Sequence, residues 1–194
     1  MKFYIEIEIR NKNTPLHYVW PRLYTQLHHV LVSQKNQNDQ VGIGLGFPDY
    51  AVRNNGNKTL GRRWRLFSEN SEDLNNLKLS EKLHELRQYL HISAVLLVPS
   101  HQIKKYHNFT RQRPGKSIEA TIRRVMKRQN ISMEHAREIC AVPEKKLDVP
   151  FVHLVSSSNG HSYTLHIARN ECLKSNISIF NTFGLSDKAS IPHF

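Results

Sequence analysis

The sequence predicts a protein of the α+β class that is organised in two domains. Three observations predict this class. Apolar residues alternate with period two over residues 3–9, as in a strand with one buried face. Helical and strand patterns then follow in the order α, β, β, α, β up to Pro99. Residues 118–129 carry apolar side chains at helical spacing, with cations on the flank and the back of the helix.

The first six predicted elements have the order β-α-β-β-α-β. They are a strand over residues 3–9, a helix over 19–32, strands over 41–50 and 60–67, a helical stretch over 71–90 that is interrupted near residue 79, and a strand over 92–98. This order is that of the ferredoxin-like fold, which is a common platform of RNA-binding proteins. We therefore predict a ferredoxin-like domain over residues 1–99.

The rest of the chain predicts a basic linker over residues 100–117 and a C-terminal RNA-binding domain over residues 118–194. The linker is rich in Lys and Arg, with the rings of Tyr106, His107 and Phe109 between them. Aromatic rings among cations can stack on unpaired bases, and an ordinary flexible linker is the alternative. Apolar alternation on both sides of the turn Ser156–Gly160 predicts a hairpin, and with it a small β-sheet.

The predicted helix of the C-terminal domain is strongly basic on one side. Ser117 is a candidate N-cap, and Glu119 in the first turn suits the helix dipole, as do the cations in the last turn. A solvated surface is the ordinary fate of such charges, so the helix alone does not establish a binding site. Its cations are Arg123, Arg124, Lys127 and Arg128.

The composition makes nucleic acid the leading partner. The 194 residues carry a formal net charge of +12, a balance suited to neutralising phosphates. No run approaches the roughly 18 apolar residues of a spanning helix, and the N-terminus has no apolar signal region, so we expect a cytoplasmic protein without a membrane partner. Cys140 and Cys172 lack the spacing of a zinc site or a disulfide scaffold. We expect no metal and no cofactor.

Five short motifs, in a fixed order, cover nearly the whole chain. They are Leu27–Val32, Gly42–Asp49, Ile122–Arg128, Leu147–Val152 with the serine-rich turn after it, and Phe183–Ser186. Together they resemble the CRISPR repeat endoribonucleases of the type I-F systems. The resemblance implies a protein that binds the stem-loop of CRISPR repeats and cleaves precursor crRNA at the foot of the stem without metal. It also implies that the product stays bound, as part of a crRNA-guided surveillance complex with other subunits.

The same resemblance implies the active-site residues, which are His28 and Ser156. A group with a pKa near neutral can take a proton from a ribose 2′-hydroxyl, and a hydroxyl group can hold the reacting ribose in line. The tyrosine that commonly precedes the Gly-Leu-Ser turn of the family is Phe183 here. Without that hydroxyl group, His28 must be oriented by packing or by another hydrogen-bonding group.

The RNA-binding residues that the resemblance implies come from the linker, the basic helix and the hairpin. Arg113 stands where the family frequently has glutamine, which leaves its base preference open. The contacts to the lower stem match Arg111 and Arg113, the groove contacts match Arg124 and Arg128 with Arg123 and Lys127 beside them, the ring under the terminal base pair matches Tyr163, and Ser158 is a further RNA-binding residue.

Two other classes of function remain open at the level of the sequence. A non-catalytic RNA hairpin-binding module would use the same basic helix as a clamp, but it has no use for both His28 and Ser156. A DNA-binding regulator would use residues 123–128 as a recognition helix, but no helix-turn-helix turn precedes them.

Overall fold

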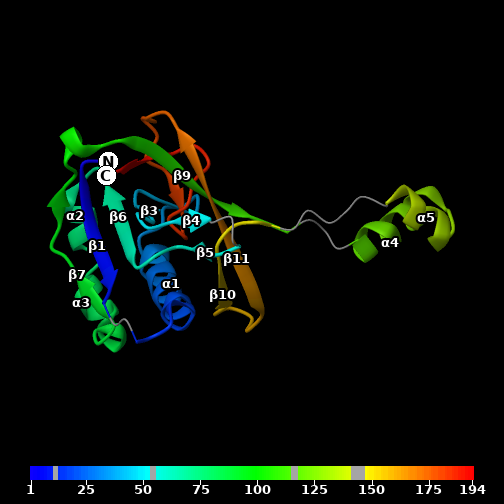
Figure 1. Ribbon diagram of the computed structural model, residues 1–194, viewed down its shortest axis with the longest axis horizontal. Coiled ribbons are helices and arrows are strands. Elements are labelled where there is room, and N and C mark those ends of the chain that lie inside the picture. Colours follow the sequence, from blue (N-terminus) through cyan, green and yellow to red (C-terminus); the bar gives the residue numbers. More distant parts are fainter. Residues whose placement is uncertain (11–12, 53–55, 115–117, 141–146) are drawn as a thin grey trace. The chain divides into compact units, whose positions relative to one another are not determined.

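The computed structural model is a mixed α/β structure with several sheets and helices (Figure 1). It describes residues 1–10, 13–52, 56–114, 118–140 and 147–194. The chain separates into two compact units, of which the first combines Met1–Arg111 with Val149–Phe194 and the second is Gln112–Asp148. This division differs from the predicted boundaries at residues 99 and 117, because the chain after residue 148 returns to the unit that the N-terminus builds.

A five-stranded sheet forms the centre of the first unit. Its order is β3 (Gly44–Gly46), β6 (Arg63–Ser68), β1 (Phe3–Ile9) and β7 (Leu90–Ile92), and β8 (Leu96–Leu97) also pairs with β1. The pairs of β1 with its three neighbours and of β3 with β6 are antiparallel. The predicted alternation of β1 is confirmed, since Ile5, Ile7 and Ile9 are buried.

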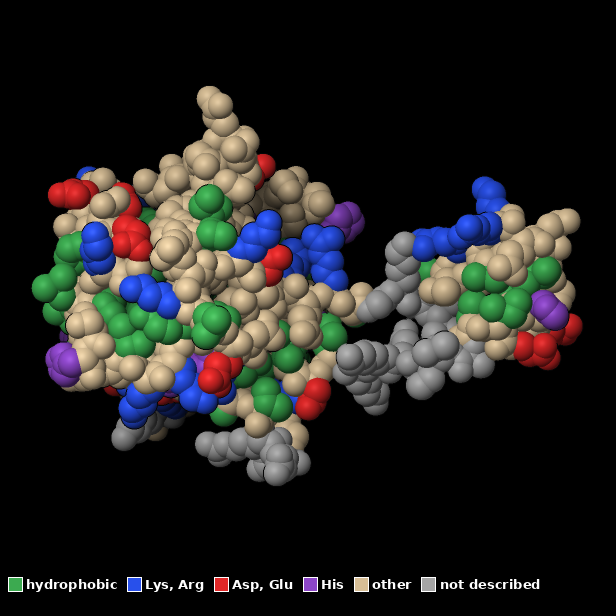
Figure 2. Space-filling model, turned by 90° about the horizontal axis from the view of Figure 1, so that it is seen from above, with side chains coloured by type: hydrophobic (Ala, Val, Ile, Leu, Met, Phe, Trp, Pro, Cys, Tyr) green, Lys and Arg blue, Asp and Glu red, His purple; other side chains and the backbone are tan. Residues whose placement is uncertain are grey.

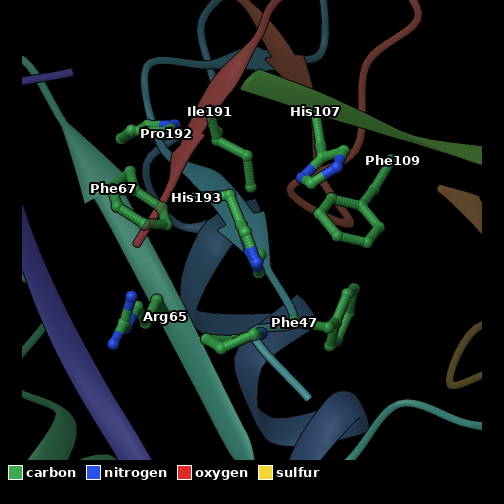
Figure 3. A pocket seen from close by; sticks show the side chains of 10 residues that line it. Phe47, Arg65, Phe67, His107, Phe109, Ile191, Pro192 and His193 are labelled. Carbon is green, nitrogen blue, oxygen red and sulfur yellow. The ribbon is translucent and has the colours of Figure 1, made fainter. Parts of the chain in front are cut away.

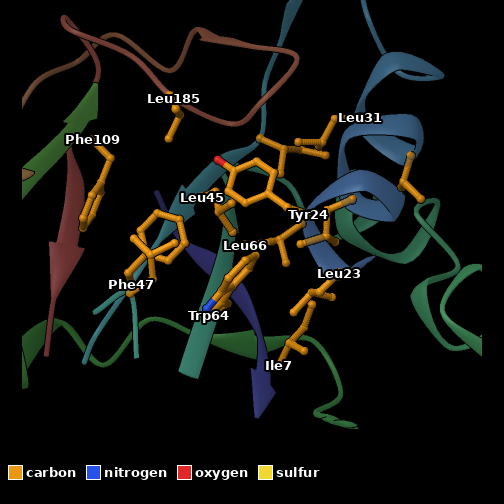
Figure 4. Close-up of a cluster of buried hydrophobic side chains, with 14 of the residues drawn as sticks. Ile7, Leu23, Tyr24, Leu31, Leu45, Phe47, Trp64, Leu66, Phe109 and Leu185 are labelled. Carbon is orange, nitrogen blue, oxygen red and sulfur yellow. The ribbon is translucent and has the colours of Figure 1, made fainter. Parts of the chain in front are cut away.

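Helix α1 (Leu16–Val32) confirms the helix predicted over residues 19–32. Its apolar stripe, which includes Leu23, Tyr24 and Leu31, is buried against side chains of the sheet (Figure 4). The ring of Tyr24 meets Trp64 of β6 edge to face, with 5.3 Å between the centroids. Each large side chain buried in this way contributes roughly 1.5–3 kcal/mol, so packing places α1 firmly on the sheet.

The prediction of one continuous strand over residues 92–98 is wrong. The chain forms two short strands there, β7 and β8, and Leu97 is 70% exposed. Ser93 explains the break, because its backbone N–H donates to the carbonyl of Glu6 at 2.9 Å while the N–H of Glu6 donates to Oγ of Ser93 at 2.9 Å. A side-chain oxygen thus replaces a carbonyl of the sheet ladder. The helical stretch before β7 is divided into α2 (Ser71–Asn75), α3 (Leu79–Lys82) and a 3₁₀ turn, η1 (His84–Leu86).

A second sheet of the first unit has the order β10 (Phe151–Val155), β11 (Ser162–Cys172), β9 (Lys105–Gln112) and β13 (Ile191–His193). The hairpin predicted around Ser156–Gly160 is confirmed as β10 and β11. The predicted linker is wrong where β9 runs. His107 and Phe109 are only 6% and 4% exposed, on alternate positions of this strand, so their rings belong to the interior and are not free to stack on bases.

Smaller elements complete the first unit. They are the 3₁₀ turn η2 (Ser100–Gln102), the ladder of β2 (Gln40–Val41) with β12 (Phe180–Asn181), and the ladder of β4 (Ala51–Val52) with β5 (Lys58–Thr59). Cys140 and Cys172 are free and partly exposed. Among the described residues, no helix has both the length and the apolar character needed to cross a membrane.

The second unit contains α4 (Ile118–Gln129) and α5 (Met133–Ile139), which pack on each other. Helix α4 confirms the predicted basic helix, and Ile122 on its apolar face is buried. The predicted cap Ser117 lies outside the described residues. Helix α5 begins after Ser132, whose Oγ accepts a hydrogen bond from the N–H of His135 at 3.2 Å.

Two histidines face each other where β9 and β13 meet, beside a cavity of about 10 Å³ (Figure 3). The rings of His107 and His193 are edge to face, with 4.9 Å between the centroids. The pKa of His107 is lowered to about 4, mainly by burial and in addition by the nearby charges of Arg169 and His193. His107 is therefore neutral in the folded protein well below the pH at which an exposed histidine becomes charged.

We expect the stability of the protein to fall as the pH is lowered from about 6.5 to about 4. In this window the unfolded chain binds a proton at His107 that the folded protein does not. The stability that the neutral His107 contributes is therefore fully present above pH 6.5 and is lost toward pH 4. Its size is on the order of 2–3 kcal/mol. Urea unfolding followed by circular dichroism at pH 7, 6, 5 and 4 measures the dependence. His107→Gln should weaken it, exposed His84→Gln should not, and equal dependence in both variants would contradict the assignment.

Candidate functional site

His28 lies near the end of α1 and is partly buried. Its Nδ1 is 2.9 Å from the carbonyl oxygen of Thr182. Because a carbonyl oxygen only accepts hydrogen bonds, Nδ1 carries the hydrogen, and Nε2 of the neutral ring keeps its lone pair. The ring of Phe183 stacks on the imidazole, with 4.1 Å between the centroids and 5° between the planes. Two consecutive residues thus fix both the tautomer and the orientation of His28.

The loop that carries Thr182 and Phe183 is itself held in place. Oδ1 of Asn181 accepts hydrogen bonds from the N–H groups of Phe183 at 2.9 Å and Leu185 at 3.2 Å. Gly184 has a φ of 71°, and its carbonyl accepts from the N–H of Leu45 in β3 at 2.8 Å. A Cβ at this position would lie 2.7 Å from Cβ of Leu45, so only glycine fits. The loop is therefore anchored to the central sheet.

Burial lowers the pKa of His28 below its usual value of 6.5. The hydrogen bond to the carbonyl of Thr182 opposes this shift by favouring the charged ring, and the nearby His29 lowers the pKa again. The net effect is a pKa of His28 below 6.5. His28 is consequently neutral at pH 7, with Nε2 able to accept a proton.

The serine turn between β10 and β11 reaches the same end of α1. Nε2 of His29 lies 2.7 Å from Oγ of Ser157. Ser156 is partly buried, and its Oγ lies 3.0 Å from Oγ of Ser158, which is exposed. The two predicted active-site residues, His28 and Ser156, therefore lie on neighbouring elements. These elements are joined by the hydrogen bond between His29 and Ser157, the residues that follow them.

Arg111 and Tyr163 belong to this site as well. Cζ of Arg111 lies 5.4 Å from the ring centroid of Tyr163 and 5.8 Å from that of Phe183. Nε of Arg111 is buried and has no hydrogen-bond partner in the described part of the chain. The hydroxyl group of Tyr24 donates to the carbonyl of Phe183 at 3.0 Å, which adds a further support to the loop. Phe183 is thus a neighbour of both the histidine and the arginine of the site.

The other predicted RNA-binding residues belong to the second unit. Arg113 is exposed, and so are the four cations of α4, which are Arg123, Arg124, Lys127 and Arg128. Figure 2 shows the Lys and Arg side chains of this unit along one side and its acidic side chains on another. The predicted division of α4 into an apolar face and a cationic side is confirmed, because Ile122 is buried while the cations are exposed.

Several residues of the site were not predicted from the sequence. Asn181, Thr182, His29 and Ser157 received no role, although they hold the loop and the serine turn. Asn181 followed three residues later by Gly184 is a pattern typical of a turn. That pattern indicates a loop, but it does not show which histidine the loop faces.

The fold and the site define a class, that of mixed α/β proteins in which a neutral histidine is held in one tautomer and can take part in acid–base chemistry. The family described as CRISPR-associated protein (Cas_Csy4) matches residues 4–194, and the chain belongs to this family. The resemblance to the type I-F CRISPR repeat endoribonucleases is thereby confirmed.

Two curated relatives are similar over most of their length. A CRISPR-associated endonuclease Cas6/Csy4 of Pseudomonas aeruginosa (strain UCBPP-PA14) is 29% identical over 199 residues, with both chains fully covered. A protein of the same description from Escherichia coli (strain UTI89 / UPEC) is 31% identical over 174 residues, which cover 89% of this chain and 88% of the relative. A solved structure described as an RAMP protein binding different RNA substrates has a TM-score of 0.36 and 10% identity over the full length of both chains, a likeness too low to support an argument.

We expect a titration of the imidazole signals by NMR to give His28 a pKa below 6.5. Phe183→Ala should raise this pKa toward 6.5, because water then reaches the ring and the charged form is less penalised. If the pKa of His28 is unchanged or lower in Phe183→Ala, the stacked ring of Phe183 does not shield the imidazole from water.

Proposed function

We propose that this protein is a metal-independent endoribonuclease that binds the stem-loop of CRISPR repeats and cleaves precursor crRNA at the base of the stem. After cleavage it remains bound to the mature crRNA as a subunit of a type I-F surveillance complex. Membership of the family supports the substrate class, and the relatives are named as CRISPR-associated endonucleases. The fixed tautomer of His28 is the observation that carries the proposed chemistry.

In the proposed reaction, Nε2 of His28 accepts the proton of a ribose 2′-hydroxyl group. The 2′-oxygen then attacks the adjacent phosphorus, and the bond from phosphorus to the 5′-oxygen of the next nucleotide breaks. The products are a 2′,3′-cyclic phosphate and a 5′-hydroxyl group, whose oxygen takes up a proton from water as it leaves. No step needs a metal ion. The neutral imidazole can itself take the proton, and the attacking oxygen belongs to the substrate, so no metal-bound hydroxide is required.

Ser156 has a positioning role in this proposal. A hydroxyl group can hydrogen-bond the reacting ribose or phosphate, which keeps the attacking oxygen in line with the leaving oxygen. Its place on a tight turn beside the end of α1 supports the role, since the turn is joined to the residue next to His28. Substrate geometry and proton transfer then come from two different elements of the fold.

RNA recognition is assigned to three groups of side chains. Tyr163 would stack under the terminal base pair, and Arg111 and Arg113 would contact the lower stem, with Ser158 nearby on the serine turn. The cations of α4 would bond phosphates along the groove of the short stem, where a helix can approach the ends of an RNA duplex. The position of Arg111 over the rings of Tyr163 and Phe183 supports this arrangement, because it places a guanidinium group at the histidine site.

We also propose that residues 1–99 form a ferredoxin-like domain within the first unit. The order β3-β6-β1-β7, with α1 between β1 and β3 in the chain and α2 and α3 between β6 and β7, supports this proposal. It gives α1 the place of the first crossover helix.

The reaction class predicts cleavage of a repeat hairpin in EDTA, with a 2′,3′-cyclic phosphate on the 5′ fragment. His28→Ala should slow single-turnover cleavage by a factor on the order of 10² to 10⁴, while the Kd for the hairpin stays within a few fold. Denaturing gels measure the rate of cleavage, mass spectrometry of the fragments identifies the phosphate end, and filter binding gives the Kd. Activity that returns only with magnesium would contradict the metal-free reaction. Tight binding without any cleavage would favour the non-catalytic hairpin-binding module.

The cationic side of α4 predicts a steep dependence of hairpin affinity on salt. Each phosphate that an arginine neutralises releases condensed counterions, so Arg124→Ala with Arg128→Ala should reduce the slope of log Kd against log salt by roughly one to two. Filter binding at several salt concentrations measures the slope. Arg137→Ala on α5 is the matched control for charge. A double variant that keeps the wild-type slope would mean that the cations of α4 form only a solvated surface.

A further inference from the structure

One hydrogen bond between α1 and the serine turn has no part in the proposed proton transfer. It joins Nε2 of His29 to Oγ of Ser157 at 2.7 Å, across 128 positions of the chain. His29 follows His28, and Ser157 follows Ser156. The bond therefore connects the direct neighbours of the two proposed active-site residues.

The serine turn is closed by hydrogen bonds of its own. The N–H of Ser156 donates to the carbonyl of His161 at 2.9 Å, and the N–H of Gly160 donates to the carbonyl of Ser156 at 2.9 Å. Gly160 has a φ of 69°, which a glycine adopts without strain. The hydroxyl groups of Ser156 and Ser158 are also 3.0 Å apart. Because the turn is internally held, one bond from Ser157 is enough to place the whole turn.

We propose that His29 is a positioning residue, whose bond to Ser157 holds the serine turn against α1 and so sets the place of the Ser156 hydroxyl group relative to the His28 ring. This inference rests on the proposed function, because it concerns the same site. It assigns to His29 an effect on the rate of cleavage through the placement of the serine turn, without direct contact to the reacting atoms.

The bond is compatible with both charge states of His29. In the neutral ring Nε2 either accepts from the hydroxyl group of Ser157 or donates to it, depending on the tautomer, and in the charged ring it donates. A glutamine side chain, which has both a donor and an acceptor at its end, can make the same kind of bond, whereas alanine cannot. Since His29 is exposed, losing the bond removes little stability, and the variants should fold.

The test is single-turnover cleavage of a repeat hairpin at saturating enzyme, together with the Kd for the same RNA. His29→Ala and Ser157→Ala should each slow cleavage about 10-fold, within the roughly 10²-fold that a 1 Å misplacement costs. The double variant should be no slower than either single variant, because both remove the same bond. His29→Gln should keep the wild-type rate, and the Kd should stay within about twofold in all variants. His17→Ala on the exposed first turn of α1 is the control.

Three results would overturn the inference. These are additive losses in the double variant, a His29→Gln variant as slow as His29→Ala, and a loss that falls on the Kd instead of the rate. Each would mean that the two side chains act separately, or through RNA binding.

A second measurement separates this inference from the proposed function. Without RNA, the amide resonances of residues 156–158 should shift in His29→Ala and much less in His29→Gln. Unmoved resonances in His29→Ala would show that His29 does not hold the turn. If the wild-type protein does not cleave the hairpin, the proposed function fails, and the resonances still decide whether the turn is held by His29.

Discussion

The hydrogen bond from Nδ1 of His28 to the carbonyl of Thr182 is the interaction on which the site depends. It joins residues 154 positions apart, and it decides which nitrogen of the imidazole keeps a lone pair. The carbonyl is in place only because Asn181 holds the loop from within and Gly184 anchors it to β3. The histidine is in place only because α1 is packed on the central sheet. The chemistry of one nitrogen atom thus requires that the first helix and the last loop of the chain close on the same sheet.

Phe183 gives this site a particular character. A tyrosine at that position could offer a hydroxyl group, whereas the phenylalanine offers a flat apolar face, which stacks on His28 with 5° between the planes. Burial is the largest cause of the lowered pKa of His28, and the ring of Phe183 contributes to that burial. Orientation therefore comes from stacking and from a backbone carbonyl. A side chain that only packs can keep a base both aligned and uncharged, because desolvation penalises the protonated form.

In the proposed function, attraction of the RNA phosphates and proton transfer are assigned to different parts of the chain. The cations of α4 are exposed, and exposed charges attract phosphates over a distance that salt limits to about 10 Å at 0.1 M. His28 is neutral at pH 7, and in the proposed reaction it acts only at contact. Arg111 is the exception, since its guanidinium group lies over the rings of Tyr163 and Phe183, within the site itself. Under the proposed function, RNA binding and turnover can accordingly be changed by separate substitutions.

The sequence by itself determined the elements whose pattern is local, because the spacing of apolar residues reports which face of an element is buried. Strand β1, helix α1, the basic helix α4 and the hairpin around Ser156 follow from such patterns, and five ordered motifs were enough to indicate the family. Strand β9 was missed because cations and a buried histidine, His107, obscure its period of two. Only the tertiary structure decided that Thr182 and Phe183 orient His28 and that His29 meets Ser157. Contacts between residues more than a hundred positions apart depend on how the sheets close, which no local pattern records.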